Sequence, residues 1–177
     1  EVRLTMRLQH PNIVRVDGVF EVDNWLFQAM ELLEGKDVRR LLSHSVQSGQ
    51  RFPVGIAVMI AATSAQALAY AHALRSESGA SLEIVHRDIS PGNIMVSSDG
   101  SVKLMDFGVV KTPGAELTAV GEMVGTVAYM APEQIRGDQV DARADLYSLG
   151  TVLYLLLTGR RPFNARTLAG YLDKHLN

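Results

Sequence analysis

The 177-residue chain has no cysteine, and aromatic residues make up only 6% of it. The missing cysteine excludes disulfide bonds, zinc sites built from thiolates and cysteine nucleophiles, and it fits a reducing compartment. Basic and acidic residues nearly balance, 17 against 19, and the formal net charge of -2 offers no positive field for nucleic acid or an anionic membrane. We therefore expect no nucleic-acid partner.

A signal peptide is also missing, and the sequence begins with Glu1 instead of methionine, so we expect it to be a piece of a longer protein. One apolar run, residues 54–74, has about the length of a membrane span. It contains Ser64, Gln66 and His72 and is rich in alanine, so a buried core helix explains it better. We expect no membrane segment within these residues.

Hydrophobic periodicity predicts a strand-rich beginning and a mostly helical remainder, which makes the fold class α+β. Asp37 is expected to cap a short helix, and Gly159 to end a strongly apolar one. The predicted helices are residues 1–8, 37–48, 53–74, 142–157 and 167–176. The predicted strands are 13–20, 25–31, 84–85, 94–96 and 102–105, and a long loop is expected at 108–130.

Three motifs occur in a fixed order: His-Arg-Asp-Ile-Ser-Pro-Gly-Asn at residues 86–93, Asp-Phe-Gly at 106–108 and Ala-Pro-Glu at 131–133. Each alone could be an ordinary turn. Together they resemble the catalytic loop, the metal-binding loop and the end of the activation segment of a protein kinase. The chain is identified as part of a eukaryotic-like (Hanks-type) Ser/Thr protein kinase of the bacterial kind.

The resemblance implies a catalytic role for several residues and ATP as the phosphoryl donor. Asp88 would orient the acceptor hydroxyl, and Asn93 and Asp106 would hold Mg²⁺, which prefers oxygen ligands and which Mn²⁺ could replace. Thr126 resembles the threonine that contacts the catalytic aspartate in Ser/Thr kinases. Glu1 aligns with the helix glutamate that pairs with the ATP-binding lysine.

The connector between the two predicted lobes would bind the nucleotide. Met30 aligns with the gatekeeper, and Glu31 and Leu33 with the residues whose backbone groups meet adenine. Asp37 would contact the ribose, and Met95 would pack beneath the base. The two methionines would serve equally well as plain core residues.

Other matching residues imply regulation. Arg87 would pair with phosphorylated Thr118, or with Glu122 acting as a fixed anion, although a solvated loop without this role stays open. Glu133 matches the glutamate that anchors the activation segment to a late arginine. Two copies of the kinase could meet to phosphorylate this segment.

Three further matches are structural. His86 and Phe107 would join Val16 in the hydrophobic stack that links the lobes, so His86 is expected to be a packed histidine and not a base. Asp145 would accept hydrogen bonds from the catalytic-loop backbone, because a buried carboxylate needs such donors.

By this resemblance the chain is a partial kinase-like domain, truncated at both ends. Residues 1–30 would be a remnant of the small β-rich lobe, 31–36 the hinge, and 37–177 the large lobe without its last helices. The 177 residues contain no G-x-G-x-x-G, and Ser90 replaces the usual catalytic-loop lysine. The late arginine that would pair with Glu133 is missing as well.

The expected function is ATP-dependent phosphoryl transfer to Ser/Thr hydroxyls of protein substrates in signalling, with the fragment inactive alone. One alternative is a pseudokinase, a scaffold that binds nucleotide or partner proteins without catalysis. Another is a small-molecule phosphotransferase, which the motif at 131–133 disfavours. The expected location is the cytoplasm, and a longer parent chain could be membrane-anchored elsewhere.

Overall fold

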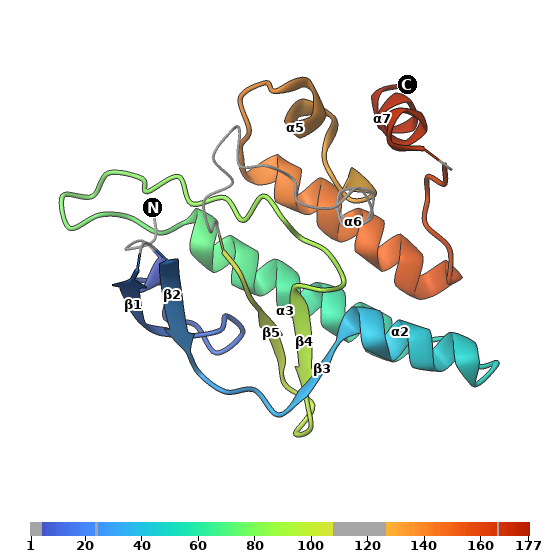
Figure 1. Ribbon diagram of the computed structural model, residues 1–177, viewed down its shortest axis with the longest axis horizontal. Helices are drawn as coiled ribbons and strands as arrows, with labels where there is room; N and C mark the ends of the chain where they lie inside the picture. The colour runs from blue at the N-terminus through green and yellow to red at the C-terminus, as the bar shows by residue number, and fades with distance from the viewer. Residues whose placement is uncertain (1–4, 24, 108–126, 166) are drawn as a thin grey trace.

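The computed structural model describes residues 5–23, 25–107, 127–165 and 167–177. Strands dominate the first part and helices the second, so the predicted α+β class is confirmed (Figure 1). The strands are β1 (Val16–Val22), β2 (Trp25–Met30), β3 (Gly35–Asp37), β4 (Ile94–Ser97) and β5 (Val102–Leu104). The helices are α2 (Val38–Gln47), α3 (Val54–His72), α5 (Pro132–Arg136), α6 (Ala142–Thr158) and α7 (Leu168–Leu176).

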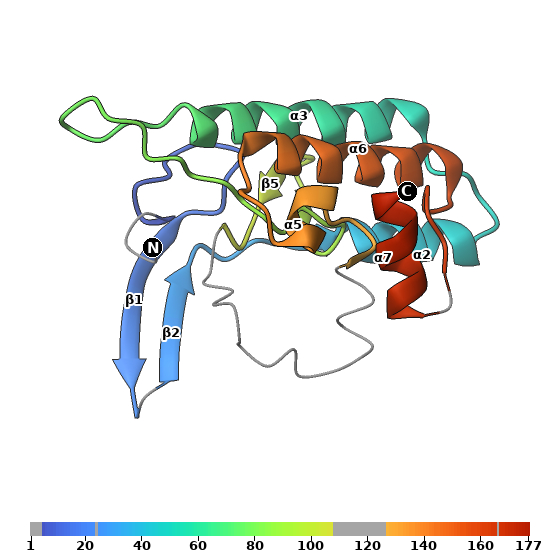
Figure 2. The ribbon, with the colours of Figure 1, turned by 90° about the horizontal axis from the view of Figure 1, so that it is seen from above.

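The strands form two small antiparallel sheets. β1 and β2 make a hairpin in which Phe20 lies opposite Phe27 and Val22 opposite Trp25. The other sheet has the order β3-β4-β5, so that the connector after β2 leads straight into a strand of the second sheet. Figure 2 shows the hairpin reaching away from the helices at one end of the molecule.

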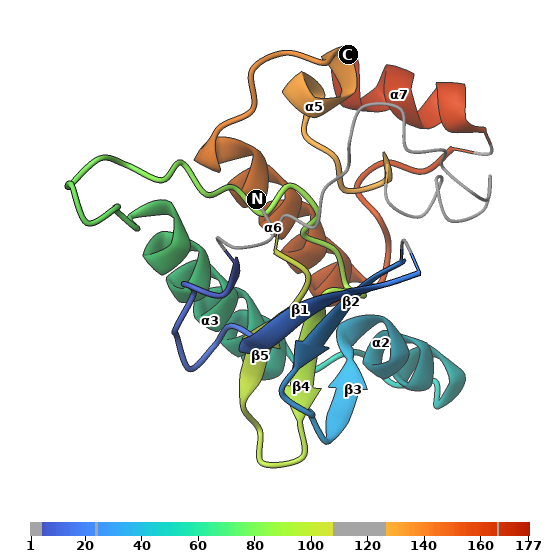
Figure 3. The ribbon, with the colours of Figure 1, turned by 60° about the vertical axis from the view of Figure 1, so that its left-hand side comes forward.

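The core lies beneath α3 and α6, which run side by side in both Figure 1 and Figure 2. Small residues on α3 bring its backbone close to its neighbours, and the buried face also carries Ile60 and Leu68. α3 also packs against β5, as Figure 3 shows from a third side. α3 therefore joins the second sheet to the helical layer.

α3 is also the one described helix that could cross a membrane by length and composition. Such a single helix is weak evidence, because core helices of soluble proteins share these properties. Its inner face contacts α6 and β5, as expected for a core helix, while its first turns leave Val54 and Val58 exposed.

The predicted helix ends are confirmed. The Asp37 carboxylate accepts a hydrogen bond from the Arg40 backbone N–H at 2.8 Å, which satisfies a free donor in the first turn of α2. Gly159 ends α6 with φ of 69°, in the left-handed region that glycine adopts without strain.

Two local elements differ from the prediction. Residues 84–85 form no strand, because the chain there bends through Glu83, with φ of 48°, toward the catalytic loop and meets no partner strand. The short helix α5 was not predicted, since the expected loop ended at residue 130 and no element was assigned to residues 131–141. Of the predicted helix at 1–8, only Thr5 is helical among the described residues.

Candidate active site

The catalytic loop at residues 86–93 is fixed to α6 through one buried carboxylate. Asp145 is only 1% exposed and accepts hydrogen bonds from the backbone N–H groups of His86 and Arg87, both at 2.8 Å. His72, in the last turn of α3, lies with its Nε2 2.7 Å from Oδ2 of the same carboxylate, the oxygen that also accepts from the His86 N–H, while Oδ1 accepts from Arg87. A single side chain therefore holds the loop and the end of α3 together.

Arg87 carries backbone strain at the start of the loop. Its φ is 65°, a left-handed conformation that costs an L-residue on the order of 1–3 kcal/mol and persists only when its surroundings enforce it. Asp145 accepts from its N–H group, and the Gln134 side chain donates from Nε2 to its carbonyl oxygen at 2.8 Å. Gln134 Oε1 in turn accepts from the Ala131 backbone N–H at 3.0 Å. The two partners fix which end of the Gln134 amide is the donor.

Asp88 and Asn93 face each other across the loop. Asn93 Nδ2 donates to the Asp88 backbone oxygen at 2.8 Å and to Asp88 Oδ2 at 3.1 Å. The Asn93 backbone carbonyl accepts from Met105 N–H at 3.0 Å, which brings the metal-binding loop alongside. Both hydrogens of the Asn93 amide are thus directed at Asp88, which leaves its oxygen as the atom suited to a cation.

Asp106 follows Met105 with a φ of 60°, also in the left-handed region. Partial burial raises the pKa of its carboxyl group, and the negative charge of Asp88 raises it further, while His86 opposes the change. A cation beside Asp106 would relieve this cost. An aspartate carboxylate and an asparagine amide oxygen are hard ligands, so these residues fit Mg²⁺.

His86 is buried and neutral. Its Nε2 lies 2.9 Å from the Met105 carbonyl oxygen and its Nδ1 3.3 Å from the Asp88 backbone N–H, so Nε2 carries the proton and Nδ1 accepts. Its ring lies 4.4 Å from that of Phe107, centroid to centroid. Burial lowers the pKa of His86, although the Asp145 charge opposes this.

Because its pKa is lowered in the folded chain, His86 should make stability depend on pH. Above the unfolded-state pKa of about 6.5 the ring is neutral in both states, and His86 does not reduce the free energy of unfolding. As the pH falls below that value, the unfolded chain gains a proton that the folded chain refuses, and stability falls. Urea unfolding between pH 7.5 and 5.5 should show a steeper loss in the wild type than in His86→Gln, by up to about 1.4 kcal/mol per pH unit. Equal slopes would contradict the prediction, since both variants keep every other titrating group.

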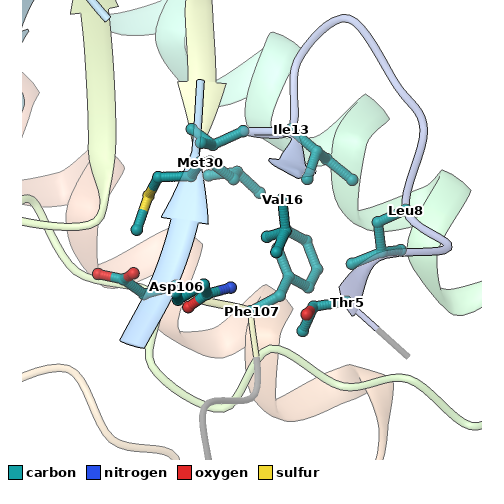
Figure 4. Close-up of a pocket in the computed structure, with 10 residues that line it drawn as sticks. Thr5, Leu8, Ile13, Val16, Met30, Asp106 and Phe107 are labelled. Atoms are coloured by element: carbon teal, nitrogen blue, oxygen red, sulfur yellow. The ribbon is translucent and has the colours of Figure 1, made fainter. Parts of the chain in front are cut away.

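A small pocket lies beside the metal-binding loop, between the hairpin and the first described turn. Figure 4 shows Met30 and Asp106 on one side of it and Phe107, Val16 and Thr5 on the other. Val16 of β1 and Phe107 thus line the same space, and the His86 ring contacts that of Phe107 at a tilt of 49°. Met30, expected as the gatekeeper, borders this pocket.

The connector after β2 is held by Glu31. Its Oε1 accepts from Lys103 Nζ at 2.6 Å and from the Arg15 backbone N–H at 2.9 Å, while its own N–H donates to the Arg15 carbonyl. Partial burial opposes ionisation of Glu31, but these hydrogen bonds outweigh it and lower the pKa of the carboxyl group. The carboxylate therefore ties the connector to the residue just before β1 and to β5.

The other predicted nucleotide residues lie on neighbouring elements. Leu33 is partly buried in the connector, and Met95 of β4 pairs with Asp37 of β3. The Asp37 carboxylate already caps α2, and its Oδ2 lies 3.4 Å from Arg40 Nε. A contact with the ribose would be made in addition to these two interactions.

Some predicted residues lie outside the described part of the chain: Glu1, Thr118, Glu122 and Thr126. Glu133 lies in α5 and is only partly buried, so an unpaired charge there costs less than a fully buried one would. Within the described ranges it makes no ion pair. No local pattern in the sequence marks the contacts made by four further residues: His72, Gln134, Lys103 and Arg39.

Comparison with known proteins agrees with this geometry. A family model described as the protein kinase domain matches residues 1–176. The chain is 38% identical over 165 residues to the tyrosine-protein kinase MasK of Myxococcus xanthus, covering 93% of this chain and 26% of that protein. It is 39% identical over 186 residues to the serine/threonine-protein kinase pkn3 of Myxococcus xanthus, covering 99% and 32%. It is 38% identical over 169 residues to the serine/threonine-protein kinase PknB of Mycobacterium leprae, covering 92% and 25%.

The chain belongs to the protein kinase domain family, and the resemblance to bacterial kinases is confirmed. It spans only a quarter to a third of the length of these relatives.

Proposed function

We propose that this chain is part of an ATP-dependent protein kinase that phosphorylates serine and threonine hydroxyls. The observation that carries the proposal is the Asp88–Asn93 pair, set on a loop that Asp145 anchors, with Asp106 on the adjoining loop. Two of the three relatives described above are named serine/threonine-protein kinases, which supports serine and threonine as acceptors, while the third is named a tyrosine-protein kinase.

In the proposed reaction the acceptor hydroxyl oxygen forms a bond to the γ-phosphorus of ATP. The bond from that phosphorus to the bridging oxygen breaks, and ADP leaves with the electron pair. The hydroxyl proton passes to Asp88, which Asn93 holds in position through Nδ2. Mg²⁺ on Asp106 and the Asn93 amide oxygen would neutralise phosphate charge.

The adenine would lie against the connector. Glu31 fixes the backbone of that segment through Lys103 and Arg15, so that its carbonyl and the Leu33 N–H are presented in a stable geometry. Met30 would limit access to the pocket of Figure 4, and Met95 would pack beneath the base.

The test is transfer of labelled γ-phosphate from ATP to a generic basic protein by the full-length protein that contains this chain. We expect Mg²⁺-dependent transfer that a chelator abolishes, with label on phosphoserine and phosphothreonine. Label on phosphotyrosine alone would contradict the acceptor class but keep the kinase. The 177-residue chain, which contains no G-x-G-x-x-G, should be inactive or nearly so in the same assay.

The second candidate is a pseudokinase, and Ser90 is the observation that favours it. A serine hydroxyl can donate one hydrogen bond but brings no positive charge to the transferring phosphoryl group. Nucleotide binding without any transfer by the full-length protein would favour this alternative over the kinase.

A further inference from the structure

Arg39 lies against the catalytic loop near Ser90, the position at which the loop has a neutral serine in place of a positively charged lysine. Arg39 is the second residue of α2, and its backbone N–H donates to the Pro91 carbonyl oxygen at 3.0 Å. The first turn of α2 and the loop are therefore joined directly, one residue away from Ser90.

The guanidinium group of Arg39 reaches the same space as the Ser90 hydroxyl. Gly92 has no side chain, and the point where its Cβ would be is 3.8 Å from Arg39 Cζ and 3.9 Å from Arg39 Nη2. The same point is 3.7 Å from Ser90 Oγ. Arg39 and Ser90 thus flank one position on the loop.

This guanidinium is available for a further partner. Its side chain is 71% exposed, and its contact to Asp37 is long, at 3.9 Å from Nε to Oδ1. Asp37 is already engaged by the Arg40 backbone at 2.8 Å and by Arg40 Nε at 3.4 Å. An exposed contact of that length does not lock a long side chain in place.

The charge of Arg39 also acts on a residue near the end of the activation segment, Tyr129. Burial raises the pKa of the Tyr129 hydroxyl, and the charge of Arg161 and, more weakly, that of Arg39 oppose the rise. Tyr129 is buried beside Ser148 of α6, which donates to its carbonyl at 2.7 Å. The guanidinium group of Arg39 thus lies near enough to Tyr129 to act on its hydroxyl electrostatically.

We propose that Arg39 supplies the positive charge that the catalytic loop lacks at Ser90, by binding the oxygens of the phosphoryl group as it is transferred. A guanidinium presents planar, paired donors that match phosphate oxygens, and it stays charged at any working pH. The inference rests on the proposed kinase function and assigns that reaction a residue that no motif predicts.

The experiment compares variants of the full-length protein: Arg39→Ala, Ser90→Lys, the double variant, and Arg40→Ala as the matched control. Arg40 is the next residue, has the same side chain and is 74% exposed, but it pairs with Asp37 at 3.4 Å. For each variant we would measure kcat and KM for ATP, the affinity for ADP and the melting temperature.

We expect Arg39→Ala to lower kcat by about 10²-fold to 10³-fold, as loss of one transition-state donor does, with ADP affinity and melting temperature unchanged. Arg40→Ala should keep its kcat. In the Ser90→Lys background the loss caused by Arg39→Ala should nearly disappear, because the lysine restores the charge.

Three results for Arg39→Ala would overturn the proposal. The first is a kcat for Arg39→Ala within about twofold of the wild type, far below the loss expected for a phosphoryl donor. The second is an equal loss in both backgrounds. The third is a parallel loss of ADP affinity or melting temperature, which would make Arg39 a structural residue. No transfer by the wild type or by any variant would refute the kinase function itself, and with it the role of Arg39. Transfer by Ser90→Lys but not by the wild type would keep the kinase function and show that Arg39 does not replace the lysine.

Discussion

Asp88→Asn in the full-length protein is expected to lower kcat for phosphoryl transfer by about 10²-fold to 10⁴-fold, the usual loss when a general base is removed. An amide cannot take the hydroxyl proton at neutral pH. Its oxygen can still accept the hydrogen bond from Asn93 Nδ2, so the loop should keep its shape. KM for ATP should therefore change little, since the connector and not Asp88 would hold the adenine.

The control for this variant is Asp99→Asn, the same chemical change in the exposed turn between β4 and β5. Asp99 Oδ1 accepts from the Ser101 backbone N–H at 2.9 Å, and an asparagine oxygen can do the same. Steady-state kinetics should show full activity for the control. A kcat above about a tenth of the wild-type value for Asp88→Asn would refute its role as the base.

Asp145→Ala is expected to lower the free energy of unfolding of the chain by about 3–5 kcal/mol. This is the usual cost when one member of a buried charged interaction is removed and its partners remain. The alanine would leave the backbone N–H groups of His86 and Arg87 without an acceptor and would remove the partner of His72 Nε2. Domains of this size are stable by only about 5–15 kcal/mol, so little stability would remain.

Urea unfolding at neutral pH measures this loss. Asp145→Asn keeps one carbonyl-type oxygen and should lose less than the alanine variant. Asp138→Ala, an exposed aspartate after α5, should stay within about 0.5 kcal/mol of the wild type. A loss below about 1 kcal/mol for Asp145→Ala would show that the loop does not depend on this carboxylate.

Much of the fold could be predicted because its signals are local. The N-terminal cap at Asp37, the glycine after α6 and the apolar periodicity of α3 all act within a few residues. The strands of the hairpin and their turn were predicted for the same reason. The pair Ile84 and Val85 shows the limit, since a strand forms only where a partner strand is available and the backbone there turns away.

The candidate site could be predicted only where a motif carries it. Asp88, Asn93 and Asp106 stand in recognisable patterns, and the structure brings the first two together and sets the third on the adjoining loop. The supporting contacts join residues far apart in sequence: His72 and Asp145 are separated by 73 positions, Lys103 and Glu31 by 72, and Gln134 and Arg87 by 47. No local pattern records such pairs, because they exist only once the helices and sheets have packed.

The two-sided hold on Arg87 implies an order of events in folding. Its N–H is bound by a side chain of α6 and its carbonyl by a side chain of α5, while its own backbone preference opposes the conformation that they impose. Each contact forms only once its own helix has docked, so the full set requires both α5 and α6 to be in place. The catalytic loop therefore acquires its final shape late, and a partly folded chain has no assembled catalytic centre.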